Sequence, residues 1–191
     1  MGVAHAWFLG ASIFAAFGVG GYTLVCLYFI FGTLSSVWGS GIAGVACAIA
    51  ALATGDYGLW QIGFVASFCS KLSDTVSSEV GKAYGKTTYL ITTFKLVPRG
   101  TEGAVSLEGT AAGALAAVLF SGVALATRQV PDLSSAGLVA AAATVANLAE
   151  SYLGASAQGR VPWLTNDLVN MLQISLAAAI AVVANQALMS A

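Results

Sequence analysis

The stretch LWQIGFVASFCSKLSDTVSSEVG, from Leu59 to Gly81, begins like a membrane-spanning helix and ends like a polar one. It is long enough to cross a bilayer, which takes about 20 residues in a helix. Its second half nevertheless carries Lys71, Asp74 and Glu79. A charge at mid-bilayer costs at least about 2.5–3.5 kcal/mol, so several charges are tolerated only against a protein interior or a wet cavity. The stretch therefore predicts a helix inside a bundle.

The polar side chains of this stretch follow the period of an α-helix. At 100° per residue, side chains three and four residues apart lie on one face. One stripe therefore holds Lys71, Asp74, Thr75, Ser78 and Lys82, with Glu79 beside it.

The chain as a whole is too apolar for a soluble protein. Of its 191 residues, 58% are hydrophobic and only 8% are charged, against about 25% charged residues in soluble domains. The mean hydropathy is +0.86. The net charge of −1 creates no field that attracts nucleic acid, so no nucleic-acid partner is expected. His5 is the single histidine, which argues against a histidine metal site or a histidine-based triad.

Hydropathy predicts an all-α fold, a polytopic integral membrane bundle of about six transmembrane helices. Glycine and alanine are frequent enough in these segments for close helix packing. We find no internal repeat, so residues 1–191 are expected to form a single transmembrane domain. The expected spans are residues 6–31, 38–54, 59–81, 107–127, 133–155 and 168–189.

Six spans place the loops 33–37, 82–106 and 156–166 on one side of the membrane. That side holds five of the six loop cations, whereas Arg128 lies on the other. Because basic loops stay inside, we expect this side to be cytoplasmic, or stromal in a plastid.

Charge is concentrated between Lys71 and Glu108, which contain nine of the fifteen charged residues. Polar groups also recur at Asn147 and Ser151. Carboxylates with Asn amides suit Mg²⁺, and Lys and Arg suit phosphates. We therefore predict a metal-assisted phosphate site at the membrane surface. The expected metal ligands are Asp74, Glu79, Glu108, Glu150, Asn166, Asp167 and Asn170, and the expected catalytic residues are Asp74, Glu79, Lys82 and Lys86. The expected phosphate or nucleotide contacts are Lys71, Ser78, Thr87, Thr88, Lys95, Arg99, Gly100, Thr101, Gly103 and Ser106, besides Lys82 and Lys86.

The segment from Gly81 to Thr87 looks like a P-loop, but it is not one. Its two glycines are one residue closer together than the two glycines of a P-loop. The segment also follows a predicted membrane helix, whereas a P-loop follows a buried strand.

Simpler interpretations also stay open for several site residues. Lys82, Lys86 and Lys95 could face anionic lipid, Asp167 could cap a helix, and Asp74 with Glu79 could form salt bridges with Lys71 and Lys82.

Four motifs resemble a known family. They are DTVSSE at 74–79, LITT at 90–93, PRGTEGAVS at 98–106 and WLTNDLVN at 163–170. This pattern is similar to that of a wide family of polytopic membrane proteins long without a known function. The version SSEVGKAYGKTTY at 77–89 resembles its phytyl-phosphate kinase branch in plants and cyanobacteria.

The resemblance implies phosphoryl transfer from a nucleoside triphosphate, CTP before others, to phytyl monophosphate. The product, phytyl diphosphate, feeds tocopherol and phylloquinone synthesis. The resemblance also implies a cyanobacterial membrane or a plastid envelope or thylakoid as the location. Relatives carry residues upstream of Met1 and a basic loop near residues 33–37, which this chain is expected to lack.

Two other functions compete with this one. A transporter of an anionic or lipid-phosphate substrate would also place charges within the membrane, but it predicts inverted repeats and polar groups in both bilayer halves. A kinase or nucleotidyltransferase acting on another prenyl lipid would keep the chemistry and change the substrate. Homo-oligomerisation is left open by the sequence.

Overall fold

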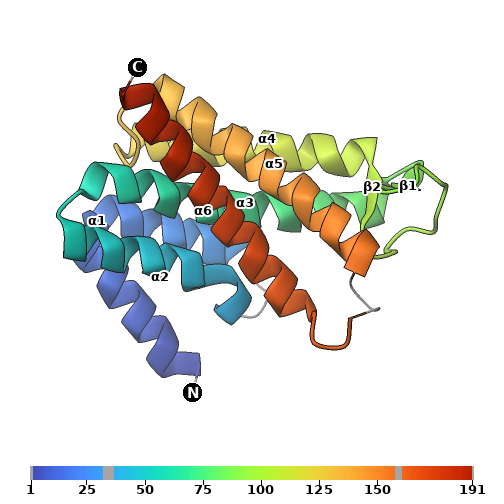
Figure 1. Cartoon of the computed structure of the whole chain (residues 1–191), viewed down its shortest axis with the longest axis horizontal. Coiled ribbons are helices and arrows are strands. Elements are labelled where there is room, and N and C mark those ends of the chain that lie inside the picture. Colours follow the sequence, from blue (N-terminus) through green and yellow to red (C-terminus); the bar gives the residue numbers. More distant parts are fainter. Residues whose placement is uncertain (1, 32–36, 158–160, 191) are drawn as a thin grey trace.

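The computed structural model describes residues 2–31, 37–157 and 161–190, and within them the chain is a helical bundle (Figure 1). Of the loop predicted at residues 33–37, residues 33–36 lie outside the described residues, and Val37 is the first residue of a helix. The elements are α1 (Gly2–Phe31), α2 (Val37–Thr54), α3 (Tyr57–Tyr84), β1 (Thr88–Leu90), β2 (Ala104–Ser106), α4 (Leu107–Ala126), α5 (Leu133–Ala157) and α6 (Asn166–Met189).

Helix α3 is the centre of the bundle and contacts each of the other five helices. Every residue from Ile62 to Lys71 is buried. A helix that is buried on all sides does not have to present an apolar face to lipid. Its neighbours provide that surface along residues 62–71, and the charges at Asp74, Glu79 and Lys82 follow in the half of the helix nearer its C-terminal end.

The outer helices have the length and composition of membrane spans. Helices α4, α5 and α6 are each long and apolar enough to cross a bilayer, and α1 and α2 contain the shorter apolar segments Gly10–Cys26 and Gly41–Thr54. The fold class predicted from hydropathy, an all-α polytopic membrane bundle, is confirmed.

Two details differ from the sequence prediction. The first span is interrupted at Gly18, whose φ of 63° and ψ of −160° lie outside the helical region, a conformation that glycine adopts without steric cost. The expected loop 82–106 contains a small antiparallel sheet, in which Thr88 pairs with Ser106 and Leu90 with Ala104.

Small residues let α3 and α4 approach closely. A Cβ added at Gly109 would lie 2.6 Å from the Ser77 carbonyl oxygen, and one at Gly113 would lie 2.8 Å from that of Ser73. On α3 the residues on this face recur every fourth position, at Ser73, Ser77 and Gly81, and the C-cap Gly85 continues the same spacing. The glycines that resemble a P-loop are therefore part of a helix-packing stripe of the small-xxx-small kind.

The connections lie at the ends of the bundle as the sequence predicts. The β1–β2 hairpin and the described part of the α5–α6 connection lie at one end, and the α2–α3 and α4–α5 connections at the other (Figure 1). The polar half of α3 points toward the hairpin end.

Candidate functional site

A polar cavity of about 710 Å³ opens at the hairpin end of the bundle. Helix α3 provides one wall, the hairpin and its loop a second, and the facing parts of α5 and α6 the rest. Carboxylates, amides and hydroxyls dominate its lining. The lining residues are Lys71, Asp74, Thr75, Ser77, Ser78, Glu79, Gly81, Lys82, Thr88, Gly100, Thr101, Glu102, Gly103, Ala104, Val105, Ser106, Asn147, Glu150, Ser151, Asn166, Asp167 and Asn170.

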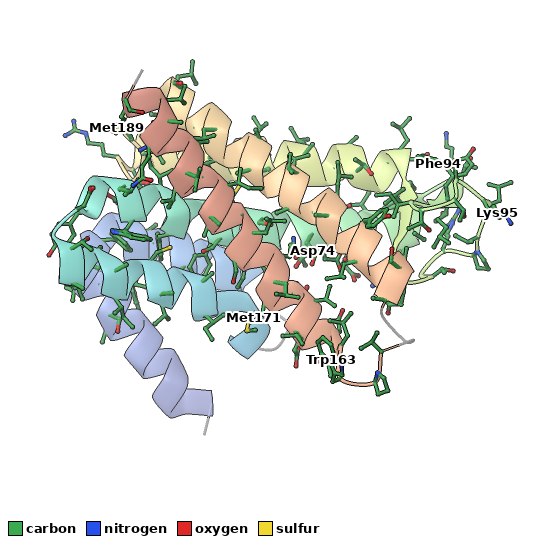
Figure 2. All side chains as sticks on the ribbon, in the orientation of Figure 1. Asp74, Phe94, Lys95, Trp163, Met171 and Met189 are labelled. Carbon is green, nitrogen blue, oxygen red and sulfur yellow. The ribbon has the colours of Figure 1, made fainter. Side chains whose placement is uncertain are left out.

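The innermost part of the cavity holds a buried ion pair. Lys71 Nζ lies 2.8 Å from Asp74 Oδ2 and donates a second hydrogen bond, of 2.9 Å, to Asn170 Oδ1 on α6. The Lys71 side chain is only 4% exposed and that of Asp74 14%. Figure 2 shows Asp74 inside the bundle, between the ribbons. The pair fixes the position of the Asp74 carboxylate and links α3 to α6.

A second set of buried hydrogen bonds supports the same helix from the other sides. Asn147 Nδ2 on α5 donates to Ser73 Oγ over 3.3 Å, and Ser73 Oγ donates to the Gly113 carbonyl on α4 over 3.0 Å. One turn deeper, Gln173 on α6 donates to both the carbonyl and the hydroxyl of Ser70. These bonds orient the polar face of α3 within the bundle.

The rim of the cavity carries a second, exposed ion pair. Lys82 Nζ lies 3.2 Å from Glu79 Oε1, and both side chains are more than half exposed. An exposed pair of this kind contributes little to stability, about 0–1 kcal/mol. Both groups are therefore free to exchange this contact for a charged ligand.

Glu150 lies on α5 at the same cavity. Its Oε2 accepts a hydrogen bond of 3.4 Å from Ser151 Oγ, and the charges of Asp74, Lys71 and Glu102 act on it. Two carboxylates on different helices, Asp74 and Glu150, therefore face one space together with Lys71.

The loop before β2 is fixed against α5 by Gly103. Its φ of +69° is in the left-handed region, and a Cβ there would collide with the Ser151 carbonyl and with Ala155. Gly100 also has a positive φ, of +82°. Ser106 caps α4, since its Oγ accepts a hydrogen bond from the Gly109 amide over 3.1 Å. Ser106 thus has a structural role in addition to lining the cavity.

Most residues predicted for the site line this cavity, and five do not. The whole α3 stripe faces it, as the helical period predicts, together with the polar residues of α5 and α6. Lys71 lines the cavity as well, where it donates hydrogen bonds to Asp74 and Asn170, and its predicted phosphate contact stays a prediction. The predicted site residues outside the lining are Lys86, Thr87, Lys95, Arg99 and Glu108.

The hairpin explains this separation. After Lys86 the chain continues into β1, and the bridge between Tyr89 and Leu96 carries the following turn away from the cavity. Figure 2 shows Lys95 at the far tip of the hairpin, distant from Asp74. Glu108 lies in the first turn of α4. The functions predicted for these residues stay predictions, without a place in this cavity.

Ser77 is a lining residue for which the sequence suggested no role. The four-residue repeat of small side chains around it on α3 is the signal that could have identified this packed face. The linking roles of Ser70 and Gln173 had no comparable signal, because 103 positions separate the two residues.

The oxygen donors of this cavity suit Mg²⁺ only if a bound phosphate substrate supplies the remaining metal ligands. Within residues 2–31, 37–157 and 161–190, no three His, Cys, Asp or Glu side chains lie close enough to hold a metal ion. Mg²⁺ commonly uses one or two carboxylates together with water and substrate phosphates. Asp74 and Glu150, with the amides of Asn147, Asn166 and Asn170, provide that kind of oxygen donor around one cavity.

Comparison with known proteins identifies the family. The family described as integral membrane protein DUF92 matches residues 33–178, most of the chain. The chain belongs to this family. The motif resemblance seen in the sequence is confirmed, and the protein is an integral membrane protein.

The relatives of this DUF92 protein include a chloroplastic protein and two uncharacterised membrane proteins. It is 43% identical to the chloroplastic protein VTE6 of Arabidopsis thaliana, over 97% of this chain and 64% of the plant protein. It is 44% identical to an uncharacterised membrane protein of Synechocystis, over 95% of this chain and 80% of that protein. An uncharacterised membrane protein of Methanocaldococcus jannaschii is 34% identical, over 73% of this chain and 57% of that protein. No solved structure matches the chain.

Proposed function

We propose that this DUF92 protein is a membrane-bound kinase. It transfers a phosphoryl group from a nucleoside triphosphate, CTP in the first instance, to phytyl monophosphate, and so forms phytyl diphosphate for tocopherol and phylloquinone synthesis. The observation that carries the proposal is the polar cavity at one end of the bundle, which combines carboxylates, amides and the Lys82 cation. The family motifs support the substrate, because they resemble the phytyl-phosphate kinase branch, and the similarity to chloroplastic VTE6 supports the pathway.

The reaction needs positioning more than it needs a strong base. A phosphate monoester is already mostly ionised at neutral pH, so the acceptor oxygen is nucleophilic without help. The main barrier is the repulsion between two polyanions, which must be held in line and screened. Lys82 on the open rim is the cation proposed to contact the phosphates, and the loop with Gly100 and Gly103 is proposed to fold over them.

Asp74 and Glu150 are proposed to hold Mg²⁺ together with the amides of Asn166 and Asn170. When bound, Mg²⁺ would supply positive charge that offsets the negative charge of the phosphates. Lys71 keeps the Asp74 carboxylate in place from the buried side. Asp167, in the first turn of α6, adds negative charge at the mouth of the cavity.

The acceptor substrate, phytyl monophosphate, is proposed to reach the cavity from the membrane. Its phosphate would enter the cavity while its prenyl chain stays among the apolar helices, where frequent glycine and alanine leave room for branches. Active-site exposure on the cytoplasmic or stromal side follows from the basic loops at this end of the bundle.

The direct test is an assay of purified protein with Mg²⁺, CTP and phytyl phosphate, with mass detection of phytyl diphosphate. Lys82→Gln is the informative variant because the side chain is exposed, so its loss should leave folding unchanged. Removing one charged hydrogen bond is expected to lower kcat/KM about 10- to 100-fold. Arg128→Gln, at the opposite end of the bundle, is the matched control and should retain full activity.

Failure to form diphosphate by folded protein would refute the proposal. Competition among phytol, phytyl phosphate and geranylgeranyl phosphate separates this kinase from one acting on another prenyl lipid. Uptake of labelled phosphate esters into proteoliposomes, without any product, would instead identify a transporter.

A further inference from the structure

The β1–β2 hairpin carries a group of exposed apolar side chains that the proposed kinase site does not use. Phe94 is 75% exposed and Leu96 is 70% exposed, and Tyr89 beside them is also exposed. Exposed apolar residues on α4 to α6 are explained by lipid around the bundle. The hairpin lies at the end of the bundle, beyond the helices (Figure 2), so that explanation does not cover it.

Backbone hydrogen bonds hold these side chains outward. The Phe94 amide donates to the Leu90 carbonyl over 2.8 Å, and the Leu90 amide donates to the Lys95 carbonyl over 2.9 Å. The Val97 amide then donates to the Thr88 carbonyl over 3.0 Å. Phe94 itself has a φ of 53°, in a region that bulky residues rarely occupy. An ordered turn that keeps an aromatic ring exposed in a sparsely populated conformation indicates a binding surface.

The charged residues nearest to this surface along the chain are cations, whereas Glu102, the one acidic residue within 88–106, lines the polar cavity. Between residues 86 and 100 the sequence contains Lys86, Lys95 and Arg99 and no acidic residue. All three side chains are exposed, and all three lie outside the lining of the polar cavity. Arg99 donates one hydrogen bond of 3.4 Å to the Ala83 carbonyl, which uses only one of the five N–H groups of its guanidinium.

We propose that the hairpin, residues 88–106, docks on anionic lipid headgroups of the membrane that contains the protein. Phe94 and Leu96 enter the interfacial layer, while Lys86, Lys95 and Arg99 bind lipid phosphates. The headgroup layer is the partner that combines apolar and anionic surface at the level of the bundle end. This docking holds the loop that carries Gly100 and Gly103 at the membrane surface beside the cavity mouth. It does not depend on which reaction the cavity performs.

The expected strength follows from the charge count. Each cation near an anionic leaflet contributes about 1 kcal/mol, which is about a fivefold change in the ratio of docked to undocked hairpin. Three cations give roughly a hundredfold change in that ratio. Because this attraction is screened, docking should weaken as salt is raised from 0.1 M to 1 M and the Debye length falls from about 10 Å to about 3 Å.

The test uses the whole chain carrying Phe94→Trp in nanodiscs of phosphatidylcholine, with or without phosphatidylglycerol. The signal from the four native tryptophans is subtracted with the parent protein. The added tryptophan should show blue-shifted emission and quenching by lipids brominated near the headgroup, most strongly with phosphatidylglycerol. Replacing Lys86, Lys95 and Arg99 together by Gln should remove the extra quenching, while Arg128→Gln should not.

Two results would overturn the proposal. One is emission typical of a water-exposed tryptophan at position 94 in both lipid mixtures, which would indicate that the hairpin surface binds a protein partner and not lipid. The other is quenching that is unchanged by the triple substitution, which would exclude recognition of anionic lipid. Thermal unfolding of the triple variant, compared with that of the parent, verifies that the bundle is intact.

Discussion

Replacing Gly109 by Ala should destabilise the bundle, although alanine is the better helix former. An added Cβ would lie 2.6 Å from the Ser77 carbonyl oxygen and 3.0 Å from the Gly81 Cα. Both are backbone atoms, so no side-chain rotation relieves the contact, and α4 must move away from α3. Overpacking of this kind costs about 1–3 kcal/mol, against a gain of about 0.5–1 kcal/mol from helix propensity.

The matched control is Gly122→Ala on the same helix. A Cβ at Gly122 meets nothing within 4 Å, so only the propensity gain of about 0.5–1 kcal/mol remains. For a chain of this size each kcal/mol shifts Tm by roughly 2–4 °C, on a scale from soluble proteins. The two alanine variants should therefore differ in Tm by several degrees, with opposite signs relative to the parent.

The buried thiols of Cys47 and Cys69 provide the assay. A thiol-reactive dye added to protein in detergent fluoresces as these cysteines become accessible during heating, and the midpoint gives Tm. A Gly109→Ala midpoint equal to or above that of Gly122→Ala would refute the close packing of α3 on α4.

Three further substitutions test the site. Lys71→Met leaves the Asp74 charge unpaired and should lower the free energy of unfolding by about 3–5 kcal/mol, whereas adding Asp74→Asn should restore part of it in the same dye assay. Ser106→Ala removes the α4 cap and should cost about 1 kcal/mol in that assay; Ser106→Asp should keep the cap, and equal losses would argue against it. Gly103→Ala should detach the loop from α5, seen as faster proteolysis between residues 98 and 104, and unchanged proteolysis would contradict that contact.

The periodicity of the sequence was sufficient to predict the polar face of α3. Residues 71, 74, 75, 78 and 82 share one side of any α-helix, and a membrane forces such a side toward the protein interior. The positions of the helices followed from hydropathy for the same reason, since lipid leaves few alternatives. Both predictions rest on local rules that need no knowledge of distant contacts.

The roles of individual residues depended on contacts that the sequence does not reveal. Lys71 was predicted to contact phosphate, and its hydrogen bond to Asn170, 99 positions later in the chain, could not be read from the sequence. The hairpin was not predicted, because its strands have three residues each and its register pairs Tyr89 with Val105, far along the chain. That register decides that Lys95 lies outside the cavity while Gly103, eight residues further on, lines it.

The hydrogen bond from Lys71 to Asn170 on α6 has a consequence for the insertion of the protein into the membrane. More than 80 residues separate the end of α3 from the start of α6, so the ribosome completes α3 well before Asn170 exists. Until then Lys71 and Asp74 lack the amide that shares their charge, and lipid alone is a poor environment for them. Helix α3 should therefore remain beside the insertion machinery, or in contact with water, until the last helix arrives. Chains arrested before α6 should be trapped at that stage and degraded.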